Sequence, residues 1–187
     1  RKRTGRGRYD TTSLLESMIG MLDFQAARFT VAGEVPPQAG NDHPTLGPMG
    51  MYATRDGHMN LAAPWGRMWS ALCEILERPE LENDPRFATT NDRALNRAAL
   101  NIELETALAP RTTEDWVERM NAVGIPSGPV NDLAQTFADP QVKHLGVAAK
   151  VTHPGVGKIE IIRNATHLDG VSDEIRRPSP DPGEHTD

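Results

Sequence analysis

Apolar side chains recur at helical spacing in four segments, and this period predicts a helix in each. A fifth, short helix is predicted after a cap at Asn131. The first segment covers 11–29, where the inward-facing positions are Leu15, Met18, Ile19, Leu22, Ala26 and Phe29. The other predicted helices cover 65–78, 92–108, the stretch between Thr112 or Thr113 and Gly124, and the stretch from Asn131 to Ala138. Their predicted inner residues are Met68, Trp69, Leu72, Leu76, Leu100, Leu104, Ala107, Leu108, Trp116, Val117 and Met120.

Capping residues support these boundaries. Thr11, Thr12 or Ser13 precedes the first helix, and Glu16 lies three residues after Ser13, which is the spacing of a capping box. Gly33 ends the same segment, since glycine accepts the left-handed conformation at a helix C-terminus.

Alternating patterns predict two pairs of strands. Residues 49–62 form the first pair around an Asp56-Gly57 turn, with Tyr52 and Leu61 on the buried face. Residues 146–152 and 158–163 form the second pair, and 125–130 is predicted to be an extended connector. Helices and strand pairs mixed in this order predict an α+β fold.

A loop rich in Gly and Pro, residues 40–48, precedes the hairpin directly. A mobile polar loop at the mouth of a rigid hairpin is a common cover for a reactive site. His43 lies within it and is a candidate active-site residue, because histidine is the residue type best suited to proton transfer, although a loop histidine without an identified partner is more often simply exposed.

Composition narrows the class of protein. The 187 residues carry a net charge of −6, which argues against nucleic acid as a partner. Cys73 is the single cysteine, so no disulfide framework exists and a cytoplasmic location is predicted. No apolar run approaches the ~20 residues of a membrane span. The basic cluster of Arg1, Lys2, Arg3, Arg6 and Arg8 is interpreted as a solvated terminus.

Single residues do not assemble a catalytic constellation. Asp10, Asp42 and Asp56 are explained by a helix start, loop solvation and a turn, and Cys73 by burial. Gly5-Arg6-Gly7 lacks the remaining residues of a phosphate loop. The other histidines lack the spacing of a zinc site, so no metal is predicted; they are His58, His144, His153, His167 and His185.

The order of short motifs is more informative than any one of them. They are Thr4–Asp10 leading into Ser13–Glu16, then Gly40–Pro44, the hairpin Tyr52–Leu61, Arg78–Leu81, Asp84–Phe87, Gly124–Val130, Asp139–Val142, His153–Gly155 and Gly183–Asp187. This series resembles the family III CoA-transferases of the CaiB/BaiF type, which include formyl-CoA transferases and α-methylacyl-CoA racemases.

The resemblance implies an architecture. Family members combine a large Rossmann-like domain with a smaller α+β domain, and two subunits interlock as a homodimer. By this resemblance, 1–30 is the end of a large-domain segment, 31–124 is the small domain, and 125–187 returns to the large domain. The missing initiator Met and the polar C-terminal end predict a fragment.

The resemblance also implies a chemistry. The family's transferases move CoA between carboxylic acids through an aspartyl-CoA thioester, without a cofactor. The nucleophilic aspartate lies upstream of the segment matched by Gly5 and Gly7, so no catalytic residue is expected in this chain. The loop aligns with the family's active-site glycine loop, which makes its residues the expected substrate-binding set: Gly40, Asn41, His43, Pro44 and Gly47.

Two alternatives stay open. The first is the racemase branch, which removes and returns a proton on 2-methylacyl-CoA thioesters. The second is a non-catalytic module that uses the fold only to dimerise. The loop has glycines only at Gly40 and Gly47 instead of a run of them, which argues against formyl-CoA transferase itself. The isolated chain is expected to be inactive.

Overall fold

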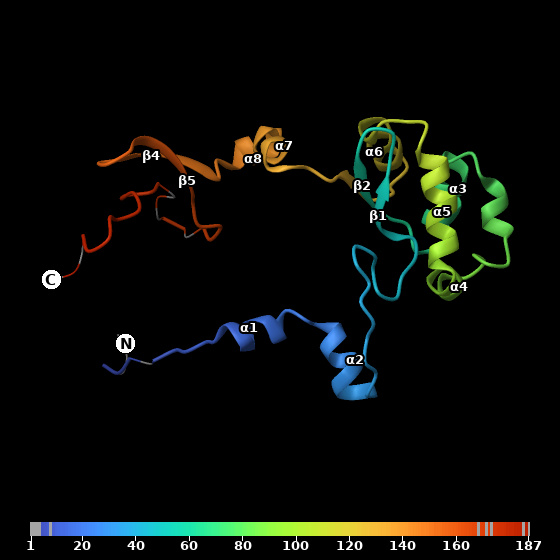
Figure 1. The fold of residues 1–187 in the computed structure, drawn as a ribbon, viewed down its shortest axis with the longest axis horizontal. Coiled ribbons are helices and arrows are strands. Elements are labelled where there is room, and N and C mark those ends of the chain that lie inside the picture. The colour runs from blue at the N-terminus through green and yellow to red at the C-terminus, as the bar shows by residue number, and fades with distance from the viewer. Residues whose placement is uncertain are drawn as a thin grey trace. The chain divides into compact units, whose positions relative to one another are not determined.

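The computed structural model describes residues 5–7, 9–167, 169–170, 172, 174–184 and 186. Helices and antiparallel strands occur together, which confirms the α+β prediction. The chain divides into two compact units, Arg1–Val130 and Asn131–Asp187, and each is described by itself (Figure 1). Most of the predicted basic cluster lies outside the described residues, since only Arg6 of that group belongs to them.

The first predicted helix is interrupted, so a single helix over 11–29 is wrong. The structure has α1 over Leu14–Gly20 and α2 over Phe24–Ala32. Gly20 favours helix weakly, and Asp23 adopts a positive φ of 47°, which no α-helix accommodates. The predicted ends hold: the Ser13 hydroxyl accepts from the Glu16 N–H, and Gly33 caps α2 with φ 69°.

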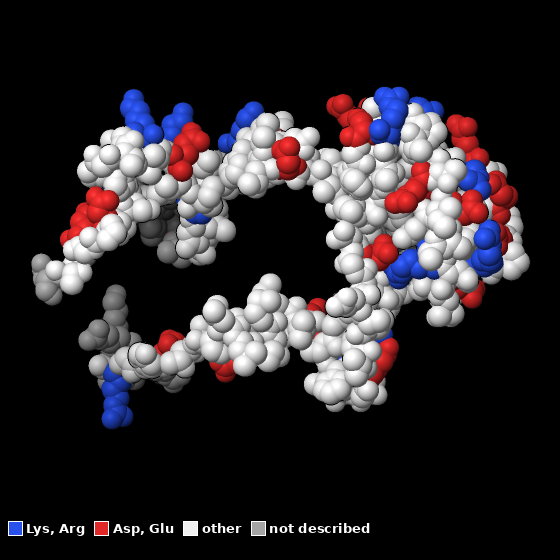
Figure 2. Space-filling model, in the orientation of Figure 1, with Lys and Arg blue, Asp and Glu red and all other residues white. Residues whose placement is uncertain are grey.

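Helices α1 and α2 contain no buried residue. Their apolar side chains stay exposed, and charged side chains are sparse along them (Figure 2). The most exposed apolar side chains of the two helices and the turn between them are Leu14, Leu15, Met18, Met21 and Val31. Such a continuous apolar surface is typical of a segment that another polypeptide surface covers.

The hairpin is confirmed, and a third strand joins it. Strands β1 (Met49–Ala53) and β2 (His58–Ala62) pair antiparallel, with Tyr52 opposite Met59. Residues 125–130, predicted as a connector, contain β3 (Ser127–Pro129), which pairs antiparallel with the other edge of β2. The sheet order is therefore β1-β2-β3.

Helices pack on this sheet to form the core of the first unit. They are α3 (Gly66–Ile75), the 3₁₀ helix η1 (Pro79–Asn83), α4 (Thr90–Leu95), α5 (Arg97–Leu108) and α6 (Thr113–Ala122). The predicted inner residues Leu72, Leu100, Leu104, Leu108 and Met120 are fully buried, beside Tyr52 and Met59 of the sheet. Cys73 is buried in the same core, and this burial raises the pKa of its thiol to about 12.

The predicted helix over 92–108 begins earlier and breaks at Asn96. Thr89 caps α4 through a reciprocal capping box with Asp92. The Asn96 side-chain amide donates to the carbonyls of Arg86 and Asp92, at 3.0 Å each. Asparagine readily exchanges helical geometry for such local bonds, which accounts for the break.

The hairpin turn is fastened to the start of α6 through Asp56. Its Oδ1 accepts from the backbone N–H of Thr113 at 2.8 Å and from the Thr113 hydroxyl at 3.1 Å. The backbone bond from Thr113, more than any other interaction, holds the pKa of Asp56 below its ordinary value of 3.8. Asp56 therefore both shapes the turn and extends the cap of α6, beside the predicted cap Thr112.

The contribution of Asp56 to stability is expected to disappear in acid. A carboxylate whose pKa is depressed by folding stabilises the protein fully above its unfolded-chain pKa, and this contribution is lost as pH falls through the folded-state pKa. Asp56→Asn should therefore flatten the decrease in unfolding free energy below pH 3.8. Urea titrations across that range measure it, and an acid dependence identical to the wild type would refute the assignment.

The second unit is built from two short helices and a hairpin. They are α7 (Leu133–Ala138), α8 (Pro140–Leu145), β4 (Ala148–His153) and β5 (Gly157–Ile162). The predicted strand pair is confirmed. The predicted cap Asn131 is wrong by one residue, because Asp132 and Gln135 form the capping box of α7. No helix among the described residues has the length and apolar character needed to cross a membrane.

Candidate functional site

The loop before the hairpin lies against strand β1, and backbone hydrogen bonds close its base. The N–H of His43 donates to the carbonyl of Met49 at 2.8 Å, and the N–H of Asp42 donates to Ala39 at 3.1 Å. Gly50 of β1 packs directly against the loop. A Cβ atom at this position would overlap Asp42 Oδ1. Glycine at this position lets the loop and the strand touch.

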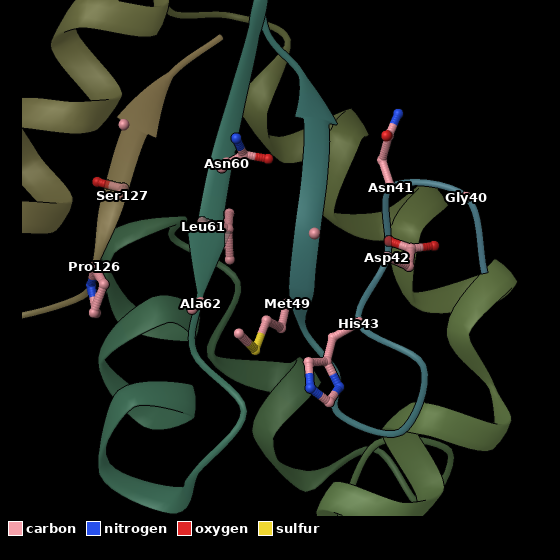
Figure 3. A pocket seen from close by; sticks show the side chains of 12 residues that line it. Gly40, Asn41, Asp42, His43, Met49, Asn60, Leu61, Ala62, Pro126 and Ser127 are labelled. Atoms are coloured by element: carbon pink, nitrogen blue, oxygen red, sulfur yellow. The ribbon is translucent and has the colours of Figure 1, made fainter. Parts of the chain in front are cut away.

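A concave pocket of about 510 Å³ opens between the loop and the sheet (Figure 3). The loop contributes Gly40, Asn41, Asp42 and His43, and the three strands contribute the opposite wall. Polar groups on that wall are the side chains of Asn60 on β2 and Ser127 on β3. None of the residues that line the pocket is Lys or Arg.

His43 is held in a defined orientation. Its Nδ1 accepts from the backbone N–H groups of Thr45, at 3.3 Å, and Leu46, at 3.1 Å. The ring stacks on Phe24 at the start of α2, with centroids 5.5 Å apart and planes 11° from parallel. The sequence suggested a partnerless loop histidine, whereas the folded loop supplies backbone partners and half-buries the ring.

One face of α4 and α5 anchors the loop through three side chains spaced four residues apart. Arg93 Nε donates to the carbonyl of Gly47 at 2.9 Å, and Arg97 Nη2 donates to that of Leu46 at 3.2 Å. Asn101 Nδ2 donates to Asp42 Oδ2 at 3.3 Å. The loop predicted to be mobile is thus hydrogen-bonded along its length.

Asp42 is directed toward this helical face. Besides its bond from Asn101, its carboxylate lies 3.9 Å from Arg97 Nη1. The loop solvation assigned to Asp42 from sequence is therefore replaced by specific partners. A carboxylate engaged in this way offsets the charge of Arg97.

The predicted site residues divide into two groups. Gly40, Asn41 and His43 line the pocket. Pro44 and Gly47 do not, and Gly47 is buried beneath Arg93, where an added Cβ would lie 3.3 Å from the Arg93 carbonyl. Gly47 therefore has an anchoring position, and the peptide bond from Gly47 to Pro48 is cis.

Asn60 and Ser127 line the pocket, although the sequence did not identify them as site residues. Asn60 is a polar residue between the buried Met59 and Leu61, a pattern that any half-exposed strand shows. Ser127 enters the pocket only because β3 pairs with β2, where it lies opposite Leu61. Within the described part of the chain, no group of three His, Cys, Asp or Glu side chains is arranged to hold a metal ion.

The sequence and the fold both match one family of known proteins. The sequence profile of CoA-transferase family III matches residues 1–186. The chain is 31% identical over 186 residues to mouse succinyl-CoA:glutarate CoA-transferase, covering 100% of this chain and 43% of the mouse protein. It is 34% identical over 158 residues to succinyl-CoA:mesaconate CoA-transferase of Haloarcula marismortui, covering 83% of this chain and 38% of that protein.

A solved structure agrees with the sequence matches. A CAIB/BAIF family protein from Brucella suis superposes with a TM-score of 0.79 at 32% identity, over 99% of this chain and 48% of that one. The chain therefore belongs to CoA-transferase family III, as the order of its motifs predicted. It spans less than half the length of these relatives.

Proposed function

We propose that the protein carrying this chain transfers CoA between carboxylic acids through an aspartyl-CoA thioester. Membership of CoA-transferase family III carries the proposal. In it, the first unit supplies a lobe and a loop that cover the thioester, while the nucleophilic aspartate lies outside these 187 residues. Coenzyme A enters as a thioester substrate, and no further cofactor takes part.

The geometry of the pocket supports a covering role for this chain and a nucleophile outside it. The one carboxylate in the loop, that of Asp42, is engaged by Asn101 and Arg97. The remaining polar side chains of the pocket are hydrogen-bonding groups without a carboxylate, namely Asn41, His43, Asn60 and Ser127. Acyl anhydrides and thioesters hydrolyse easily, so a wall that excludes water and offers hydrogen bonds to a developing oxyanion suits them.

The test uses the full gene product that carries this chain. Succinyl-CoA is supplied with glutarate, with mesaconate and with a panel of short mono- and dicarboxylates, and the new acyl-CoA is measured by mass spectrometry. The first two pairs are taken from the names of the mouse and haloarchaeal relatives. Formation of a new acyl-CoA is the expected result, and no exchange across the panel would overturn the proposal.

The covalent step has its own readout. Addition of succinyl-CoA without an acceptor acid is expected to leave CoA attached to one aspartate, releasing succinate. Peptide mapping should place the adduct outside the 187 residues. An adduct on an aspartate within them would reassign the nucleophile. Deuterium entering the α-carbon of a 2-methylacyl-CoA without any acceptor acid would instead identify the racemase branch.

We further propose an interlocked homodimer in which α1 and α2 are covered. The exposed apolar surface of the two helices and the turn between them includes Leu15, 70% exposed, and Leu22, 52% exposed. Burying a leucine contributes about 1.5–3 kcal/mol, so Leu15→Glu with Leu22→Glu should weaken dimerisation by roughly 10²-fold or more. Sedimentation velocity measures it, with Leu95→Glu, an isolated exposed leucine, as the control. A monomeric wild type would contradict the assembly.

A further inference from the structure

The hydrogen bonds of His43 fix which ring nitrogen carries a proton. Both Thr45 and Leu46 direct backbone N–H groups at Nδ1, so Nδ1 must present its lone pair to them. In the neutral ring the proton then resides on Nε2. The two backbone groups act as an orienting clamp, because the tautomer of a histidine is set by the bond that its other nitrogen makes.

The same contacts fix the direction in which Nε2 points. The stack on Phe24 holds the plane of the ring, and the bond from His43 N–H to the Met49 carbonyl holds the backbone beneath it. One ring nitrogen faces back to the loop, and the other points away from it, on the side where Met49 lies (Figure 3). His43 is thus a rigid side chain on a loop that is anchored at several points.

The Nε2–H group is a donor with nothing to donate to in the described part of the chain. Hydrogen bonds of the ring within that part involve Nδ1 alone. The side chain lines the pocket, where Asn60 and Ser127 occupy the opposite wall. A half-buried donor held at fixed orientation in a concave site is a preorganised contact for an acceptor atom of a ligand.

We propose that His43 Nε2–H binds an oxygen of the acyl group being transferred, either a carboxylate oxygen of the acid or the carbonyl oxygen of its thioester. The inference rests on the proposed function for the identity of the ligand. The direction of the hydrogen bond follows from the ring alone: because the proton is on Nε2, this nitrogen can only donate, and the ligand atom must be an acceptor. His43 is therefore a substrate-contacting donor, and it is not the base that would remove an α-proton in racemase chemistry.

Two substitutions separate this role from a purely structural one. In His43→Asn, the side-chain oxygen can still accept from the backbone N–H groups of Thr45 and Leu46, while the donor directed away from the loop is gone. We expect this variant to keep the wild-type melting temperature and to lose roughly 10²-fold in kcat/KM for CoA exchange, as when a single oxyanion donor is removed. His43→Gln places an amide N–H near the position of Nε2 and should recover part of that loss.

The exposed His58 on β2 provides the matched control, since it lies outside the pocket. His58→Asn should leave kcat/KM unchanged. His43→Asn with wild-type kcat/KM would overturn the inference while leaving the proposed function intact. Equal losses of exchange and of melting temperature in both His43 variants would also overturn it, because they indicate that His43 only supports the loop.

A spectroscopic measurement decides the protonation independently of activity. Long-range nitrogen–proton correlation spectra of the full protein, assigned through His43→Asn, should show Nε2 protonated and Nδ1 bare, with Nε2 shifting when succinyl-CoA is added. Protonation on Nδ1 would overturn the inference whatever the exchange assay shows. Absence of exchange together with an Nε2-protonated ring would reject the proposed function, and the succinyl-CoA titration would then decide alone whether the donor binds an acyl oxygen.

Discussion

Arg93→Met is expected to lower the free energy of unfolding by about 3–5 kcal/mol. Arg93 is 2% exposed and donates to carbonyls from three separate segments, those of Gly47, Phe87 and Pro64, at 2.8–2.9 Å. Methionine preserves much of the apolar stem but leaves the carbonyls of Gly47 and Phe87 without these donors, whereas the Pro64 carbonyl keeps the bond from the Thr90 hydroxyl. Each such unpaired group costs on the order of 1–3 kcal/mol, which exceeds what removal of a buried charge returns.

The guanidinium of Arg93 also lies 4.8 Å from the ring centroid of Trp69, which is itself buried. Burial lowers the pKa of Arg93 from its ordinary value, and arginine nonetheless stays charged. Urea unfolding followed through tryptophan fluorescence measures the change in unfolding free energy, since Trp69 contacts Arg93. Lysine retains the charge without the planar fork, so Arg93→Lys should fall between Met and the wild type.

Arg86 provides the control for Arg93. Its guanidinium also lies over an aromatic ring, 4.7 Å from the centroid of Phe87, but its side chain is 49% exposed. Its ion pair with Asp84 is at the surface, where such pairs contribute about 0–1 kcal/mol. Arg86→Met should therefore change stability by less than about 1 kcal/mol. Equal losses of unfolding free energy in Arg93→Met and Arg86→Met would show that the buried hydrogen bonds of Arg93 do not stabilise the first unit.

Gly50→Ala is expected to displace the loop and to destabilise the protein by about 1–3 kcal/mol. The added Cβ would overlap Asp42 Oδ1 and come within 3.2 Å of Asn41 O and Asp42 Cα. Rotation of the Asp42 side chain would relieve the severe overlap but would disturb its bond from Asn101, and the two backbone atoms would still have to move by a few tenths of an ångström. Since Asn41 and His43 flank Asp42, the CoA exchange that we propose for the full protein should fall as well.

A double-mutant cycle isolates the clash of Gly50→Ala. Asp42→Ala removes the overlapping carboxylate, so Gly50→Ala should cost less in that background than in the wild type. Gly66→Ala is the matched control: Gly66 begins α3, and nothing lies within 4 Å of its added Cβ. Alanine there should be neutral or slightly stabilising. Additivity of the Asp42 and Gly50 substitutions would contradict the close packing of loop and strand.

Local pattern sufficed for much of the secondary structure. The Asp56-Gly57 hairpin, the caps at Ser13 and Thr112, and the buried face of α5 all rest on interactions between residues close in sequence. Two predicted helices are wrong because the chain breaks where the apolar period continues. Asn96 breaks a continuous apolar period because its amide reaches the Arg86 carbonyl, ten residues earlier. Asp23 breaks the first predicted helix through its positive φ, which the spacing of apolar residues does not reveal.

One wall of the candidate site could be predicted from the sequence, and the other could not. The loop and its residues Gly40, Asn41 and His43 were identified from motif order and lie at the pocket. The opposite wall depends on β3, whose partner strand lies more than sixty residues earlier. Nothing in the stretch around Ser127 indicates that partner, because strand pairing is a property of the packed sheet.

The sequence by itself determined the family, the α+β class and most helix and strand positions, since these depend on motif order and local periodicity. Only the tertiary structure decided that Arg93, Arg97 and Asn101 fasten the loop and that the Asp42 carboxylate accepts from Asn101. It also decided that His43 presents one defined nitrogen. The physical reason is that hydrogen bonds between residues about fifty positions apart exist only after the chain has folded.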